Sequence, residues 1–431
     1  MRYASIGSEF FTLNRMNFSH KLKVNSVAVF HSNDEFTRNG DQNYPFRQNS
    51  DFFYLTGIEQ EQSLLILAPN HPDPKLREVL FLLEANEQLE TWFGHKLTIA
   101  EAQKISGIKK VMFVSRLDLV LNEIILASEN IYFNFNEYVK YSTEVMSRDR
   151  RFAEKLKEKY PAHKFERSAP ILAELRTIKS DIEIALIQKA IDITEIAFRK
   201  VLYKTKPQLK EYEVQSEIDY EFTRNGANGH AYAPIIATGI NACTLHYVEN
   251  DKVCKDGEML LMDFGAEYAN YAADLTRTIP VNGKFTTRQR AIYEAVLRVQ
   301  KEAIKMLVVG NTVDKLNKAV NGLMQSELLN LGLMTDDEFK DPIKANSVLL
   351  KYFMHGTSHY LGLDVHDVGS KYEEMKAGMV FTCEPALYIK EEGIGIRLEN
   401  DILVTKEGPV DLMKNIPIEP DEIEALMAEG N

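Results

Sequence analysis

Cysteine is scarce in this sequence of 431 residues, which holds three copies, Cys243, Cys254 and Cys383. Their number is odd and none forms a C-x-x-C pair, so the sequence indicates neither a disulfide framework nor a thiolate zinc site. We expect all three to be small, buried, apolar residues.

Long apolar runs and an excess of basic charge are also missing. No apolar stretch approaches the roughly 18–20 residues of a membrane span, and residues 1–18 lack the apolar core of a secretory signal. We therefore expect no membrane association and a cytoplasmic location. Lys and Arg number 51 against 63 Asp and Glu, a formal net charge of −12, so we expect no nucleic-acid partner.

The residues that are present describe a folded protein with two domains. Hydrophobic residues make up 45% and charged residues 26%, as in globular proteins. Single domains stop growing near about 250–300 residues, so this length predicts two. Short apolar runs at 63–68 and 78–83 alternate with helical patterns, which predicts an α/β first domain. The pattern resets near residues 168–171, and we place the domains at 1–172 and 173–431.

Two sequence patterns in the second part of the chain predict the N-termini of helices. Ser180 with Glu183 and Thr286 with Gln289 have the form of capping boxes, and apolar residues at helical spacing follow each of them. We expect two amphipathic helices that pack against a sheet.

The first pair of candidate functional carboxylates is Asp263 and Asp274. Asp263 ends the apolar strand-like run 259–262, and Asp274 lies in the second β-like run 271–278. With a turn at Tyr268 and Ala269, the two aspartates would be direct cross-strand neighbours. Two buried like charges repel each other, so this arrangement calls for a cation.

A second pair repeats the pattern. Glu384 follows the apolar run 379–383, Glu399 lies in the run 395–401, and their midpoint falls on residues 391–392, just before Gly393. A hairpin turn there would bring the two glutamates together across a ladder. Two metal ions about 3.5–4 Å apart, bridged by carboxylates, would resolve the repulsion in both pairs and activate a bridging water.

Three histidines, His355, His359 and His366, lie between the second aspartate and the glutamates. His355 and His359 are four residues apart, as in the helical H-E-x-x-H zinc motif, but Gly356 replaces the glutamate and disfavours a helix. We therefore reject a zincin. Chemistry alone leaves open which histidine is a ligand; four carboxylates and one imidazole favour manganese, with cobalt, zinc or iron as alternatives.

At these motifs the sequence resembles the Xaa-Pro aminopeptidases (aminopeptidase P) of the pita-bread metallopeptidase family, which also holds prolidase and methionine aminopeptidase. The resemblance covers nearly the whole chain and implies an α/β N-terminal domain of the creatinase/prolidase type followed by an α+β pita-bread catalytic domain. Methionine aminopeptidase lacks the N-terminal domain, which the stretch 44–57 resembles. The motifs are Leu261-Met-Asp-Phe-Gly265, Tyr271-Ala-Ala-Asp-Leu-Thr-Arg-Thr278, the run from His355 to Gly369, Thr382-Cys-Glu-Pro-Ala-Leu-Tyr388 and Gly395-Ile-Arg-Leu-Glu-Asn-Asp401.

The resemblance also implies roles for individual residues. Asp274 and Glu399 would bridge the two metal ions, and Glu384 would be both ligand and general base. The substrate would be held by His355 and Arg397 on the proline side and by Trp92 from a neighbouring subunit of a homo-oligomer, a dimer or a tetramer; the alternative for Trp92 is ordinary core. The full metal-binding set would be Asp263, Asp274, His359, Glu384 and Glu399, with His246 and His366 acting on the tetrahedral intermediate.

The implied reaction is release of the N-terminal residue from peptides with proline in second position, by attack of a metal-bridging hydroxide on the Xaa-Pro carbonyl. The bond before proline is a tertiary amide without an N–H, so such an enzyme must recognise the ring by shape. Three alternatives stay open: a prolidase that cleaves dipeptides alone, a metal-free creatinase-like amidinohydrolase, and a non-catalytic pita-bread binding protein. The complete ligand set argues against the last two.

Overall fold

The computed structural model describes residues 2–430, which divide into two compact units, one from Tyr3 to Arg176 and one from Thr177 onward. The predicted division after residue 172 falls inside helix α7 (Ala169–Thr177). Among the described residues, no helix combines the length and the apolar character that a membrane span requires.

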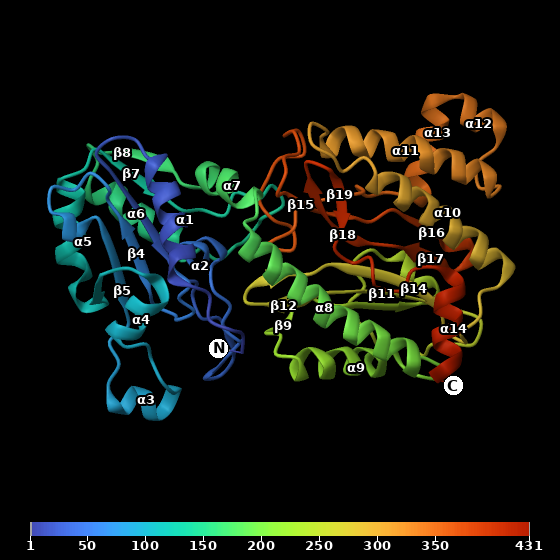
Figure 1. Cartoon of the computed structure of the whole chain (residues 1–431), viewed down its shortest axis with the longest axis horizontal. Helices are drawn as coiled ribbons and strands as arrows, with labels where there is room; N and C mark the ends of the chain where they lie inside the picture. The colour runs from blue at the N-terminus through green and yellow to red at the C-terminus, as the bar shows by residue number, and fades with distance from the viewer. Residues whose placement is uncertain (1, 431) are drawn as a thin grey trace. The chain divides into compact units, whose positions relative to one another are not determined.

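The first unit is built on a six-stranded mixed sheet, with helices on both faces (Figure 1). The strand order is β6 (Lys110–Phe113), β5 (Glu78–Leu82), β4 (Leu64–Leu67), β1 (Ser26–His31), β7 (Asn130–Phe133) and β8 (Lys164–Arg167). Its helices are α1 (Ser8–His20), α2 (Ser50–Thr56), α3 (Glu87–Phe93), α4 (Ile99–Ser106), α5 (Leu117–Leu126), α6 (Arg148–Lys159) and α7, and a small hairpin joins β2 (Thr37–Asn39) to β3 (Gln42–Asn43).

Alternation along the central strands gives this sheet two apolar faces. Val27 and Val29 of β1 pack in one cluster with apolar residues of α5 and α6. The next residue, Phe30, points to the other face, where its ring packs edge-to-face against Phe18 of α1 with 5.2 Å between the ring centres. The predicted strands at 63–68 and 78–83 are confirmed as β4 and β5, and so is the α/β class.

In the second unit, helices surround small antiparallel sheets (Figure 1). Both predicted capping boxes are present, at the starts of α8 and α10. Helix α8 packs against β12 and β13, and α10 packs against β15, β16 and β17. The helices are α8 (Asp181–Lys204), α9 (Glu211–Arg224), α10 (Thr287–Ile304), α11 (Val313–Asn330), α12 (Asp336–Lys340), α13 (Pro342–Tyr352) and α14 (Pro420–Gly430).

The hairpins of the second unit carry the candidate carboxylates. The first half contributes β9 (Gly229–His230), β10 (Ile235–Thr238), the 3-10 helix η3 (Gly239–Cys243), β11 (Met259–Phe264), β12 (Ala266–Tyr268), β13 (Tyr271–Ala272) and β14 (Leu275–Pro280). The second half contributes β15 (Val380–Cys383), β16 (Ala386–Ile389), the 3-10 helix η4 (Lys390–Glu392), β17 (Ile394–Arg397), β18 (Asn400–Thr405) and β19 (Gly408–Asp411).

Candidate active site

The first carboxylate pair lies on the hairpin of β11 to β14, but in a different register from the predicted one. Asp263 faces Thr276 across the ladder, and the turn is formed by Ala269 and Asn270, whose φ angles are 51° and 65°. Asp274 is therefore a diagonal neighbour of Asp263, and the prediction of direct cross-strand neighbours is wrong. Diagonal neighbours still share one face of a sheet, so the two side chains can converge.

A tyrosine joins these two aspartates. The Tyr232 hydroxyl lies 2.5 Å from Oδ1 of Asp263 and 2.5 Å from Oδ1 of Asp274. On its other oxygen, Asp263 accepts a hydrogen bond from the Arg397 guanidinium at 2.5 Å. The backbone N–H of Asp274 donates to the buried Asp401 at 3.1 Å. Both aspartates are thus fixed by protein contacts.

The second pair has the predicted register. Cys383 pairs with Asn400 in one ladder and Ala386 with Arg397 in the next, so Glu384 and Glu399 stand opposite each other between them. The turn falls at η4 and Gly393, whose φ of 64° is left-handed. The predicted hairpin at residues 391–393 is confirmed.

Contacts between the two hairpins bring the pairs together. The Thr276 hydroxyl donates to Oε2 of Glu399 at 2.6 Å, and the Glu399 N–H donates to the Thr276 carbonyl at 3.1 Å. His359, in a loop rather than a helix, places Nε2 3.5 Å from Asp274 and 3.6 Å from Glu384. Asp274, His359 and Glu399 each offer a ligand atom, and these atoms lie within 4.8 Å of one another.

The electrostatics of this cluster are those of buried like charges. Burial, together with the neighbouring carboxylates, raises the pKa of Asp263, raises that of Glu384 to about 7, and raises that of Glu399 well above its usual range. Burial opposes the charged form of His359, but its contacts with Asp274 and Glu384 outweigh this and raise its pKa to about 9. Carboxylate oxygens gathered around one imidazole are the kind of donor set that binds a divalent metal ion.

His355 lies beside this cluster in a chain of polar contacts. Its Nε2 is 2.9 Å from the Tyr388 hydroxyl, which also accepts from Arg397 at 2.7 Å. Its Nδ1 is 2.8 Å from the Gly356 carbonyl and 3.7 Å from Glu384. Burial, with the nearby charge of Arg397, lowers the pKa of His355 to about 4, so the ring is neutral at pH 7.

The remaining candidate residues are exposed. His246 lies in the loop between η3 and β11, close enough to His355 to influence its pKa, and the His366 ring lies 4.4 Å from that of His359. Trp92 is 76% exposed on helix α3, so the alternative that it belongs to the core of its domain is wrong.

Sequence reasoning missed three side chains of the site: Tyr232, Tyr388 and Thr276. Each contacts a candidate ligand or histidine, and tyrosine and threonine are too common in strands and loops to indicate a site by residue type alone. Both Thr276 and Tyr388 lie inside the motifs already noted, Thr276 two residues after Asp274 and Tyr388 four residues after Glu384, spacings that put side chains on the same face of a strand. Strand periodicity could have indicated them.

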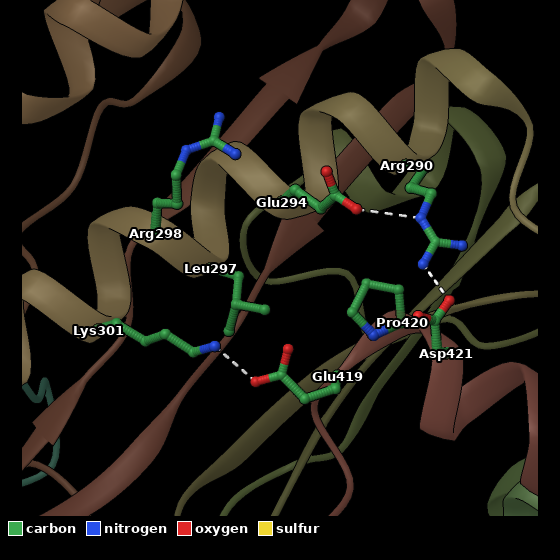
Figure 2. A pocket seen from close by; sticks show the side chains of 8 residues that line it. All are labelled: Arg290, Glu294, Leu297, Arg298, Lys301, Glu419, Pro420 and Asp421. Carbon is green, nitrogen blue, oxygen red and sulfur yellow. Dashed lines mark hydrogen bonds and ion pairs between the residues drawn. The ribbon is translucent and has the colours of Figure 1, made fainter.

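A hollow lies away from these residues, between α10 and the start of α14 (Figure 2). It has a volume of about 240 Å³. Arg290 is paired with Glu294 at 3.0 Å and also with Asp421, and Lys301 is paired with Glu419 at 2.5 Å. The pairs with Glu419 and Asp421 attach the start of α14 to α10, and we assign the hollow a structural role.

Comparison with known proteins agrees with the geometry. Residues 185–406 match metallopeptidase family M24, and residues 11–132 match the aminopeptidase P N-terminal domain. The chain belongs to metallopeptidase family M24. It is 37% identical to the Xaa-Pro aminopeptidase of Haemophilus influenzae and 35% identical to that of Escherichia coli, covering 98% of this chain and of the relative in each case.

A solved structure gives the same result. Zinc-substituted Escherichia coli aminopeptidase P in complex with product superposes with a TM-score of 0.90 at 33% identity, over 99% of this chain and 100% of that one. Within the M24 family, the chain is therefore a metal-dependent aminopeptidase of the Xaa-Pro aminopeptidase group, with peptides that carry proline in second position as substrates. The predicted two-domain fold class and the predicted activity are confirmed.

Proposed function

We propose that the site holds two divalent metal ions, manganese by preference with cobalt, zinc or iron as alternatives. The observation that carries this proposal is the convergence of carboxylates from two hairpins on one histidine. Asp274 and Glu399 would be the ligands shared by the two ions. When bound, the ions would activate a water for attack on the Xaa-Pro carbonyl and stabilise the negative charge that develops on its oxygen. The proposed ligands are Asp263, Asp274, His359, Glu384 and Glu399.

The protein's own groups would then bind the substrate and move protons. Glu384 is the proposed general base, because its carboxylate lies among the proposed ligands, 3.6 Å from His359 and 3.7 Å from His355, where it could accept a proton from the attacking water. His246 and His366, both exposed, would donate hydrogen bonds to the oxygens of the tetrahedral intermediate.

The proline side of the site is assigned to His355 and Arg397. The Arg397 guanidinium is directed at Asp263, Thr276 and the Tyr388 hydroxyl, so its contribution there is to position Tyr388 and, through it, His355. These contacts would fix the shape of the site on the proline side. A fixed shape suits a proline substrate, because the proline nitrogen has no N–H by which the site could recognise it.

Trp92 is the proposed contribution of a neighbouring subunit. It is 76% exposed and Phe93 beside it is 71% exposed, on a helix without a buried residue between Glu87 and Phe93. Large aromatic rings exposed together are typical of contact surfaces. We therefore propose a homo-oligomer, a dimer or a tetramer. As its location we propose the cytoplasm.

The test is an assay of metal-stripped protein reloaded with manganese, offered one Xaa-Pro dipeptide and one Xaa-Pro-Xaa tripeptide, with Asp274→Ala as the matched variant. Release of the first residue from the tripeptide, lost in the variant together with bound metal, would support the proposal. Cleavage of the dipeptide alone would show a prolidase, and metal-independent cleavage would refute the assigned ligand set.

A further inference from the structure

The loop that carries His246 has little regular structure of its own. Residues 244–253 connect η3 to the approach of β11 without forming a helix, and an isolated bridge between Lys210 and Val253 is their one ladder contact among the described residues. The His246 side chain is exposed at this loop. A histidine that must meet a reacting oxygen to within a fraction of an ångström therefore depends on contacts that hold the loop from outside.

A buried carboxylate supplies such contacts. Glu211, at the first turn of α9, has a relative exposure of 0%. Its Oε1 accepts hydrogen bonds from the Thr238 N–H at 2.7 Å and the Asn241 side-chain amide at 3.4 Å. Its Oε2 accepts from the Tyr247 hydroxyl at 2.7 Å and the Lys252 N–H at 3.0 Å.

These four donors lie on both sides of His246 in the chain. Thr238 and Asn241 precede the histidine, and Tyr247 and Lys252 follow it. One carboxylate thus attaches the segment 238–252, which contains most of this loop, to α9 on both sides of His246. The carboxyl form matters, because a glutamine would turn an N–H₂ group toward two donors at one of the two oxygen positions.

Neighbouring contacts extend this attachment toward the metal-binding cluster. Asn250, whose φ is 48°, accepts from the Ile236 N–H at 3.0 Å and donates to Gln215 of α9 at 3.0 Å. Ile235, one residue earlier on β10, is the ladder partner of Asp263. The loop, α9 and the strand beside Asp263 therefore form one connected framework.

We propose that Glu211 is a positioning residue for His246, acting through the segment 238–252 that carries this histidine. This inference rests on the role of His246 in the proposed function. Glu211 touches neither the candidate ligands nor the substrate side of the site in the contacts described. Its removal should therefore displace His246 and leave the metal-binding cluster intact.

The experiment is a double-mutant cycle with Glu211→Gln and His246→Ala, measured as kcat and KM on an Xaa-Pro-Xaa tripeptide. Glu211→Gln should lower kcat/KM by about 10- to 100-fold, because small misplacements of a reacting group cost that much. In the His246→Ala background the same change should cost less than about twofold, because residues that act as a unit are not additive.

Four further comparisons make the test specific. Bound metal per subunit should be the same in Glu211→Gln and the wild type, and both single variants should show the same division of the loss between kcat and KM. Glu213→Gln, the same change two residues on at an exposed position, should leave kcat/KM unchanged. Tyr247→Phe removes one donor to Glu211 and should give a smaller loss that is also absent in the His246→Ala background, so the test stands even where Glu211→Gln folds poorly.

The outcomes separate the two proposals. Losses that multiply in the double variant, or loss of bound metal in Glu211→Gln, would overturn the positioning role. Full activity of His246→Ala would instead overturn the role given to His246 itself, while leaving the metal-dependent cleavage, tested by Asp274→Ala, in place.

Discussion

Replacing Arg397 with methionine tests the electrostatic reasoning most directly. The Arg397 side chain is 5% exposed, and its guanidinium bonds to Asp263 at 2.5 Å, Thr276 at 3.1 Å and the Tyr388 hydroxyl at 2.7 Å. Arg397→Met keeps the volume of the aliphatic stem and removes the guanidinium that is paired with Asp263. The carboxylate then stays in a buried, acidic cluster without this partner.

The magnitude follows from the burial of the pair. Removing one partner of a buried ion pair costs about 3–5 kcal/mol. For a unit of this size, each kcal/mol lowers the midpoint of thermal unfolding by about 2–4 °C, so we expect a decrease of roughly 6–20 °C in metal-stripped protein. A bound cation would replace part of the lost positive charge, and the decrease should be smaller once the protein is reloaded with manganese.

The assay is thermal unfolding followed by circular dichroism, with and without metal, alongside bound-metal analysis and KM for a tripeptide. Arg397→Lys, which keeps the charge but cannot reproduce the three directed bonds, should give an intermediate decrease. Equal decreases in metal-stripped and metal-loaded protein would refute the reasoning. A raised KM with unchanged stability would do so too, because it would place Arg397 in direct contact with substrate.

Three other predictions concern different parts of the structure. In Gly265→Ala, the new Cβ would lie 1.7 Å from the Ala273 carbonyl oxygen, a backbone atom that cannot move aside, so bound metal and the unfolding midpoint should both fall; an unchanged metal content would contradict this. Trp92→Ala should change the unfolding midpoint by less than about 1 °C, because the ring is 76% exposed. It should lower kcat/KM, because we propose that the ring reaches the active site of a neighbouring subunit. Activity equal to that of the wild type at all protein concentrations would contradict this role. Metal-stripped protein should lose stability as the pH rises from 5 to 8: burial raises the pKa of Glu384 to about 7, so its contribution is fully present below its unfolded value near 4.5 and is lost as the pH passes 7, and melts that are flat over this range would contradict it.

The sequence predicted the second hairpin better than the first, for a physical reason. Gly393 marks the second turn, and glycine adopts a left-handed φ without a steric cost. The first turn is Ala269 followed by Asn270, both left-handed. Alanine gives no signal for such a turn, so the midpoint was placed one residue too early and the register of Asp263 with Asp274 was missed.

Residues that act by positioning other residues could not be predicted from the sequence. Glu211 stands 35 positions before His246, on a helix that composition and periodicity describe as ordinary. The resemblance assigns Arg397 to the proline side, whereas the structure shows that its guanidinium donates a hydrogen bond to Asp263. Such roles depend on tertiary distance, which a single sequence does not record.

Both hairpins share a feature that explains why their carboxylates can converge. The ladder of the first hairpin is interrupted at Gly265, between β11 and β12, and that of the second at Pro385, between β15 and β16. Glycine lets the opposite backbone approach closely, and proline cannot donate a ladder hydrogen bond. Asp274, Glu384 and Glu399 all lie at these interruptions, where strands can bend. An uninterrupted pleated ladder would instead hold its side chains perpendicular to each sheet, and ligands from two separate hairpins would not meet at one point.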